Sequence, residues 1–194
     1  MADKVIAADT EAWVLIPAVE VLGDPQSIGV AGSFKIGVLT AAAVNEYLSI
    51  VDRSSAGYTG AGGNITLSVK DDSKLAQSSS ETDGDKAINA SGNSVVPTSQ
   101  NYDAKLTIFR DKLSAATDSN YNLANDNIRA RGVRYIAFRR IGFAYNSAAL
   151  AGQKYNAFYV QTDHPIDMYG DGNNQTIEVS LVTKSISVED AILL

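Results

Sequence analysis

Few side chains in this sequence have the chemistry of acid–base or nucleophilic catalysis. His164 is the only histidine, and it follows Asp163 in a pair that resembles part of a catalytic dyad. Adjacent residues of a strand point to opposite faces, and the residue before a proline, here Pro165, is held extended. The two side chains therefore diverge, and we interpret this segment as the end of a strand. The chain also contains no Gly-x-Ser-x-Gly turn that would present a serine nucleophile.

Glycine-rich and acidic turns do not define a ligand site either. The segment 32–37 has the glycine spacing of a phosphate-binding loop, but Val38 and Leu39 stand where Lys and Ser or Thr are required. The turns that start at Asp83 and Asp171 lack the glycine and the closing glutamate of an EF-hand loop. With no cysteine, thiol nucleophiles, disulfides and cysteine-bound metals are excluded. We therefore predict no catalytic residue, no metal, no cofactor and no enzyme activity.

The densest charge feature is basic, although the chain carries a net charge of −6. Guanidinium groups bind carboxylates and phosphates in a planar fork. We consider two interpretations of this basic cluster about equally good. In one, the arginines contact carboxylates of a neighbouring copy; in the other, they are solvated residues at the ends of a helix and of strands. Nucleic-acid binding ranks third, because the chain is acidic and no stacking aromatics are interleaved with the cluster. The cluster consists of Arg129, Arg131, Arg134, Arg139 and Arg140.

The elements that must position these residues are mostly strands. Alternating apolar and polar residues, rich in β-branched and aromatic types, predict strands over 13–21, 64–70, 103–110, 133–141, 155–162 and 176–188. Ala104, Leu106 and Ile108 are expected on one face of their strand, with Asp103, Lys105 and Thr107 on a wet face. Helices are predicted over 39–50, capped by Thr40, and over 120–131, ending at Gly132.

The stretch 71–102 is dominated by Ser, Asp, Asn, Gly and Thr, and it predicts a long extended loop. Loops of this length in compact domains are usually functional or disordered, and the alternative is a surface segment with a short strand near 94–96. No linker divides the chain, so we expect one domain over 1–194 with extended termini. The longest apolar run, 12–19, is too short to cross a bilayer, and the first residues lack a signal-peptide pattern, which indicates a soluble protein made in a cytoplasm.

A series of segments in a fixed order carries a family resemblance. It comprises the helix-like 39–50, the glycine turn and strand 63–69, and the polar stretch with Thr82, Asp83 and Lys86, followed by Asn101, Tyr102 and the segments 105–110, 132–140, 155–165 and 177–182. This order resembles the major tail tube proteins of long-tailed, noncontractile (siphovirus-type) bacteriophages, especially those that infect actinobacteria.

The resemblance implies a mainly β (α+β) fold: a β-sandwich or partly closed β-barrel with a flanking helix, a long inter-ring loop and extended termini. It also implies a virion structural protein that is assembled in the host cytoplasm into stacked hexameric rings. These rings form the tail tube through which DNA is ejected. The implied partners are other copies of the chain, a tape measure protein, a tail terminator and distal tail proteins. Genomic DNA would pass without specific binding, and no membrane is involved.

Candidate site residues follow from this resemblance. The loop 71–102 is expected to reach the next ring, and the expected subunit contacts are Arg129, Arg131, Arg134, Asp83, Asp85 and Lys86. The expected lumen-facing residues are Lys105, Thr107, Glu178 and Ser180. An acidic balance suits a DNA conduit because a basic lining would hold phosphates, and strand edges open in a monomer would be paired in the ring.

The alternative function is a carbohydrate-binding or adhesin-like β-sandwich. Such a module needs exposed aromatic rings for sugar stacking, and the candidates are Trp13, Tyr58, Tyr102, Tyr121 and Tyr169. Tyrosines are equally common in subunit interfaces, so their presence does not separate the two functions.

Overall fold

A computed structural model of the chain describes residues 11–22, 39–83, 96–169 and 175–194, and every structural statement below concerns these residues. The protein is mainly β, with 43% of its residues in strands and 17% in helices, which confirms the predicted fold class. The strands are β1 (Glu11–Pro17), β2 (Gly63–Asn64), β3 (Lys74–Asp83), β4 (Val96–Phe109), β5 (Arg134–Ile141), β6 (Lys154–Thr162), β7 (Ile166–Met168) and β8 (Thr176–Ile192). The helices are α1 (Ala18–Leu22), α2 (Ala41–Leu48) and α3 (Asn120–Arg129), with a 3-10 turn η4 (Thr66–Ser68).

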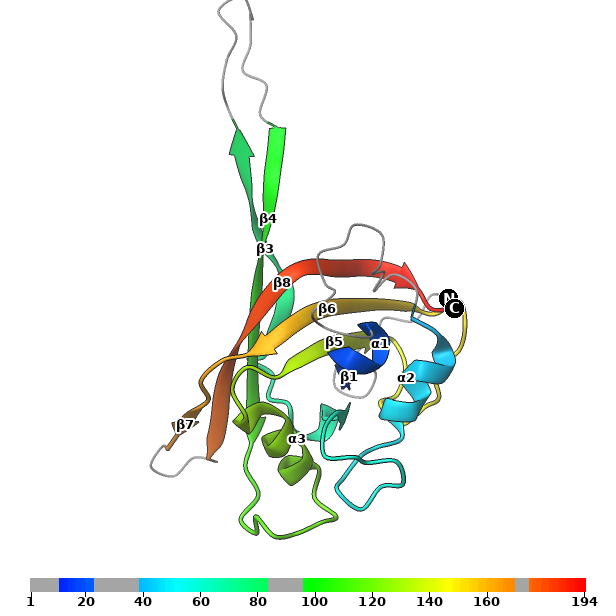
Figure 1. Cartoon of the computed structure of the whole chain (residues 1–194), viewed down its shortest axis with the longest axis vertical. Coiled ribbons are helices and arrows are strands. Elements are labelled where there is room, and N and C mark those ends of the chain that lie inside the picture. Colours follow the sequence, from blue (N-terminus) through cyan, green and yellow to red (C-terminus); the bar gives the residue numbers. More distant parts are fainter. Residues whose placement is uncertain (1–10, 23–38, 84–95, 170–174) are drawn as a thin grey trace, which may run out of the picture.

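The strands form an antiparallel sheet in the order β2-β1-β5-β6-β8-β4-β3, with β7 attached to β8. β8 joins two halves of this sheet, because Leu181–Ile192 pairs with β6 whereas Thr176–Ser180 pairs with β4. In Figure 1, β8 curves over the body and then descends beside β4. The two halves face each other across a shared core, so the single open sheet is sandwich-like.

The bend of β8 has an identifiable cause in its register. Between the pairs Tyr155↔Ala191 and Ala157↔Val188, β8 contains one more residue than β6, and a second shift follows one step further along. Extra residues of this kind are β-bulges, which bend a strand and increase its twist. Asp190 lies in the first bulge with φ of 53°, and its backbone N–H donates to the Asn156 side chain over 2.9 Å.

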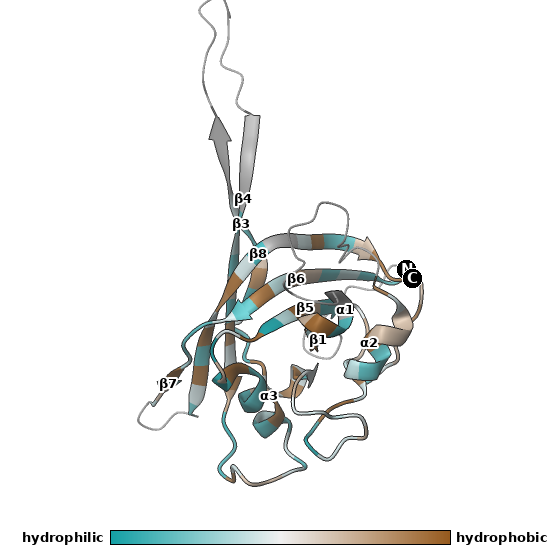
Figure 2. Ribbon diagram, viewed as in Figure 1, coloured by the Kyte–Doolittle hydropathy of each residue, from teal (hydrophilic) through white to brown (hydrophobic). Residues whose placement is uncertain are grey.

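Two apolar cores cover the two faces of β1, β5 and β6. The first lies under α2 and includes Val14, Ile136 and Tyr159. The second fills the space between the two halves of the sheet and under α3, and includes Leu15, Phe158, Leu106 and Ile177. Hydrophobic and hydrophilic bands alternate along β6 and β8 in Figure 2, as expected where successive side chains of a strand point to opposite faces.

Both predicted helices are confirmed: α2 lies within 39–50 and α3 within 120–131. Thr40 caps α2, with its Oγ1 accepting a hydrogen bond from the Ala43 N–H over 3.3 Å. α3 ends at Arg129, shortly before Gly132, whose φ of 84° suits the residue after a helix. One face of α3 is buried, because Leu123, Asn127 and Ile128 are all inaccessible to solvent.

Two predicted strands were wrong in extent. The strand expected over 13–21 ends at Pro17, which lacks a backbone donor, and α1 begins at Ala18. The strand expected over 64–70 breaks after Asn64, because the Asn64 side chain accepts hydrogen bonds from the Thr66 N–H and hydroxyl and turns the chain into η4. The strands expected over 103–110, 133–141, 155–162 and 176–188 are confirmed by β4, β5, β6 and β8.

The prediction of an extended loop over 71–102 was also wrong. Most of the described part of this stretch is strand, since β3 and β4 pair from Lys74↔Lys105 to Asp83↔Val96. A strand pair that is polar on both faces lacks the alternation by which strands are predicted, so composition alone indicated a loop.

Candidate assembly interface

β3 and β4 form a two-stranded ribbon that projects from the body (Figure 1). Only Lys105–Phe109 of β4 also pairs with β8, so the part of the ribbon beyond these residues has no third strand among those described. The ribbon is anchored at its base, where Leu75 and Ala104 are buried and the Tyr102 ring packs edge-on against Phe158 at 5.6 Å. Residues 76–79 are exposed beyond this base.

A two-stranded ribbon without a core is marginally stable in water, so contact with another surface would stabilise the projecting part. Asp83 lies at the end of β3 and pairs with Val96, which places it at the far end of the described ribbon. Asp85 and Lys86, which were also predicted to contact a neighbour, lie outside the described residues.

The sheet leaves strand edges open among the described residues. β3 is the last strand of the sheet, and β7 pairs only with β8. β7 exposes two apolar side chains on one face, with Ile166 at 54% and Met168 at 48% of full exposure. Open edges are templates for pairing with another chain, so both strands are candidate contact surfaces.

A charge clamp on the opposite face holds β7 in place. Arg129 at the end of α3 donates to both oxygens of Asp167 over 3.0 and 3.3 Å, and Arg110 lies 3.5 Å from the same carboxylate. The Arg129 hydrogen bonds lower the pKa of Asp167 below its ordinary value. Arg110 also donates to the Tyr169 hydroxyl over 2.9 Å. A three-residue edge strand is thus fixed to α3 and β4.

The predicted arginine cluster does not form one surface. Arg140 is fully buried, and Arg139 pairs with Glu11 and lies over the Trp13 ring at 5.2 Å. Of the three arginines predicted to contact a neighbouring subunit, Arg129 is engaged with Asp167, whereas the side chain of Arg131 is 74% exposed beside Asp163 at 3.3 Å. Arg134, at the start of β5, is half-buried.

Buried Arg140 organises a loop. Its Nη2 donates to the carbonyl oxygens of Ala144 and Ser147 over 3.0 and 2.8 Å, and its Nη1 donates to the Gln153 side chain over 3.0 Å. Burial lowers the pKa of the guanidinium, which also lies over the Phe143 ring at 5.3 Å. This arginine therefore holds the β5–β6 connection together. Nothing in the local sequence indicated this role, because Arg139 beside it has the same side chain and a different environment.

The predicted lumen-facing residues lie on β4 and β8. Lys105 pairs directly with Ser180 and Thr107 with Glu178, so these four side chains share a face of the sheet. Ser180 is exposed, and Lys105 and Glu178 are partly exposed. Thr107 is only 2% exposed, so its assignment to a lumen was wrong. The turn 70–73 folds against it, with the Lys70 N–H donating to the Thr107 carbonyl over 2.8 Å.

Asparagine side chains that the sequence analysis did not single out connect the loops to α3. Asn127 accepts a hydrogen bond from the Gly62 N–H over 2.6 Å and donates to the Gly62 carbonyl over 3.2 Å. Asn120 donates to the carbonyls of Val51 and Asn64, both over 2.7 Å. The high asparagine content of this helix, which weakens helix propensity, was the available signal for such contacts.

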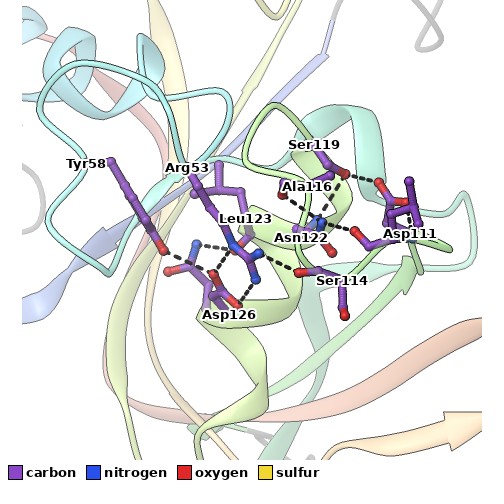
Figure 3. A network of polar contacts seen from close by, with 11 residues as sticks. Arg53, Tyr58, Asp111, Ser114, Ala116, Ser119, Asn122, Leu123 and Asp126 are labelled. Atoms are coloured by element: carbon purple, nitrogen blue, oxygen red, sulfur yellow. Dashed lines mark hydrogen bonds and ion pairs between the residues drawn. The ribbon is translucent and has the colours of Figure 1, made fainter.

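A second polar network ties the same helix to two exposed loops (Figure 3). Arg53 forms a two-pronged ion pair with Asp126 at 2.6 Å and donates to the Ser114 carbonyl over 2.7 Å. Asp111 accepts a hydrogen bond from the Ser119 hydroxyl, which lowers the pKa of this carboxyl, and Ser119 caps α3. These contacts fix two loops to α3.

The aromatic residues proposed for sugar stacking do not form a common platform. Trp13 is buried at 8% exposure beneath Arg139, and Tyr58 and Tyr102 are partly buried. Trp13 borders a cavity of about 470 Å³ that is also lined by Glu11, Lys70, Asp71 and Arg139. Tyr121 and Tyr169 are exposed, at 38% and 64%.

Other chemistry is limited in the part of the chain that the structure describes. No group of three or more His, Cys, Asp or Glu side chains in those ranges converges as metal ligands would. None of the described helices has the length and apolar character needed to cross a membrane.

The fold and these surfaces define a mainly β protein that offers strand edges and a projecting ribbon to other chains. The sequence matches the family model of the phage tail tube protein over residues 56–193, which is most of the chain. The protein therefore belongs to the phage tail tube protein family and is a structural component of the virion tail. A search of curated proteins found no match. The actinobacterial host inferred from the sequence receives no support from the family match.

Proposed function

We propose that this chain assembles in the host cytoplasm into hexameric rings that stack into the tube of a noncontractile phage tail, through which DNA is ejected. The single observation that carries the proposal is the β3–β4 ribbon, a projecting polar strand pair without a core of its own. Its length suits contact with a copy in the next ring. The tape measure, terminator and distal tail proteins are the further partners that such a tube requires.

Within a ring, the open edges of β3 and β7 would be covered by neighbouring copies. Closed rings need two different surfaces that complement each other, and these edges lie on different strands of the sheet. We also propose that Arg131 and Arg134, with Arg129 beside them, meet carboxylates of a neighbour such as Asp83. Charge reversal at Arg131 and Arg134 should then weaken assembly and change its salt dependence. Unchanged assembly would remove these arginines from the interface.

Deletion of the ribbon tests its role directly. Gln77 and Tyr102 are paired, so joining them by Asn-Gly replaces the projecting part by a two-residue hairpin turn. Leu75, Tyr102 and Ala104 remain, so the variant should keep its circular dichroism spectrum and cooperative unfolding. Electron microscopy of concentrated protein should show tubes for the wild-type chain and only monomers or single rings for the variant. Tubes formed by a folded variant would contradict the inter-ring role.

The alternative function, a carbohydrate-binding module, can be tested with the same purified protein. A glycan array should show no selective binding by the assembled protein, because the exposed tyrosines and Trp13 do not share a stacking surface. Selective binding of one glycan class would instead favour the carbohydrate-binding alternative.

A further inference from the structure

The face of the sheet that carries Lys105 contains a ladder of matched charges. Lys74 and Lys105 lie directly opposite each other on β3 and β4, and Asp103 is two residues before Lys105 on the same face. The ion pairs are Lys105–Glu178 at 2.6 Å, Lys74–Asp103 at 3.8 Å and, in the adjoining turn, Lys70–Asp72 at 3.1 Å. Each of the three lysines therefore has a carboxylate partner.

The Lys105–Glu178 pair is the tightest of the three and joins two different strands. Its side chains are 33% and 28% exposed, whereas those of Lys74 and Asp103 are 66% and 52% exposed. Partly exposed pairs of this kind contribute little to folding, because solvent screens the two charges. β4 and β8 are already joined by five backbone pairings and a buried core, so the pair is not needed to hold them together.

The balance of charges on this face determines how strongly it attracts DNA, which is a polyanion. A lysine ammonium without a partner would bind DNA phosphates and release their counterions, which favours retention of the duplex. Neutralisation by a neighbouring carboxylate removes this attraction without placing a net negative charge at the position. We propose that Glu178 cancels the charge of Lys105 on the DNA-facing side of the tube, so that this strand pair presents no free cation to passing duplex. This inference rests on the proposed function, because it needs the β4–β8 face to line the lumen.

The test uses assembled tubes and a short fluorescent DNA duplex. Glu178→Gln keeps the shape of the side chain but frees Lys105. Glu189→Gln makes the same change in net charge at an exposed position on the other half of β8 and serves as the matched control. The double variant Lys105→Met/Glu178→Gln removes both charges and should behave as wild type.

We expect Glu178→Gln tubes to retain the duplex in sedimentation at 50 mM salt and to release it by 200 mM. If one duplex contacts two Lys105 side chains that have lost their carboxylate partner, raising the salt from 50 to 200 mM should reduce the amount of retained duplex by about tenfold more than in wild-type tubes. Tubes of the control and of the double variant should match wild type. A duplex blocked at both ends by streptavidin cannot thread into a tube, so the gain should disappear with it.

The outcomes separate the two claims. If tubes form but Glu178→Gln retains no more duplex than Glu189→Gln, the role of the pair is refuted and the tube function stands. If the gain persists with the blocked duplex, Lys105 faces the outside of the tube and the inference is also refuted. If the wild-type chain forms no tubes under any assembly condition, the proposed function fails and this inference fails with it.

Discussion

Asn127 offers the sharpest test of how the loops are held to the body. Its fully buried side chain accepts hydrogen bonds from the Gly62 N–H and the Tyr135 hydroxyl, over 2.6 and 3.2 Å, and donates to the Gly62 carbonyl. Asn127→Leu keeps the branched shape of the side chain but leaves two buried donors, the Gly62 N–H and the Tyr135 hydroxyl, without an acceptor. Each unsatisfied buried donor costs about 1–3 kcal/mol, whereas burial of the leucine side chain returns about 1.5–3 kcal/mol, so the central values leave a net loss of about 2 kcal/mol.

The assay is urea unfolding of dilute monomer, followed by circular dichroism and by the fluorescence of Trp13, the only tryptophan. Asn125→Ala is the matched control, because it lies in the same helix, is half-buried and has a carbonyl oxygen without a hydrogen-bond partner in the described structure. Alanine raises helix propensity, so this control should change stability by less than about 0.7 kcal/mol. A loss below about 1 kcal/mol for Asn127→Leu, or an equal loss for both variants, would refute the reasoning.

Three further predictions concern the β8 bulge, the ion pairs that hold β7 and the buried guanidinium of Arg140. Asp190 has a φ of 53°, a conformation that glycine adopts readily and a β-branched residue does not. Asp190→Gly should therefore raise the free energy of unfolding by about 0.5–1 kcal/mol, and Asp190→Val should lower it, as measured by thermal melts. The opposite order of stability would show that the bulge imposes no strain. The pKa of Asp167 is lowered by Arg129, so the pair stabilises the fold above the unfolded-state pKa, and this contribution disappears as the pH falls through the lowered value. Wild type should therefore exceed Asp167→Asn in stability at pH 7 and lose that advantage as the pH is lowered below the ordinary pKa of an aspartate and through the lowered one. A difference independent of pH would rule out this explanation. Arg140→Met leaves the loop carbonyls of Ala144 and Ser147 without their donor, so it should lower the free energy of unfolding by about 2–4 kcal/mol and speed proteolysis within 142–153. An unchanged rate of cleavage would mean that other contacts hold the loop.

Local chemistry was sufficient to predict the elements that have one buried and one exposed side. The strands at 134–141 and 154–162 alternate or are strongly apolar, and α2 begins where Thr40 offers a capping hydroxyl. The order of such elements along the chain carried the family resemblance, which the match over residues 56–193 confirms. These features depend on residues within a few positions of one another, so a linear pattern contains them.

Features that depend on distant partners were decided only by the tertiary structure. The polar ribbon segments 74–83 and 96–102 are strand because they belong to two segments that pair with each other, and their composition did not indicate it. Arg129, Arg139 and Arg140 are close in sequence, yet one clamps β7, one covers Trp13 and one is buried under a loop. Thr107 alternates with core residues but is itself covered, because the turn 70–73 folds against its strand. The sequence alone determined the class of the fold and its capped helices, whereas burial and charge pairing depend on residues brought together from distant parts of the chain.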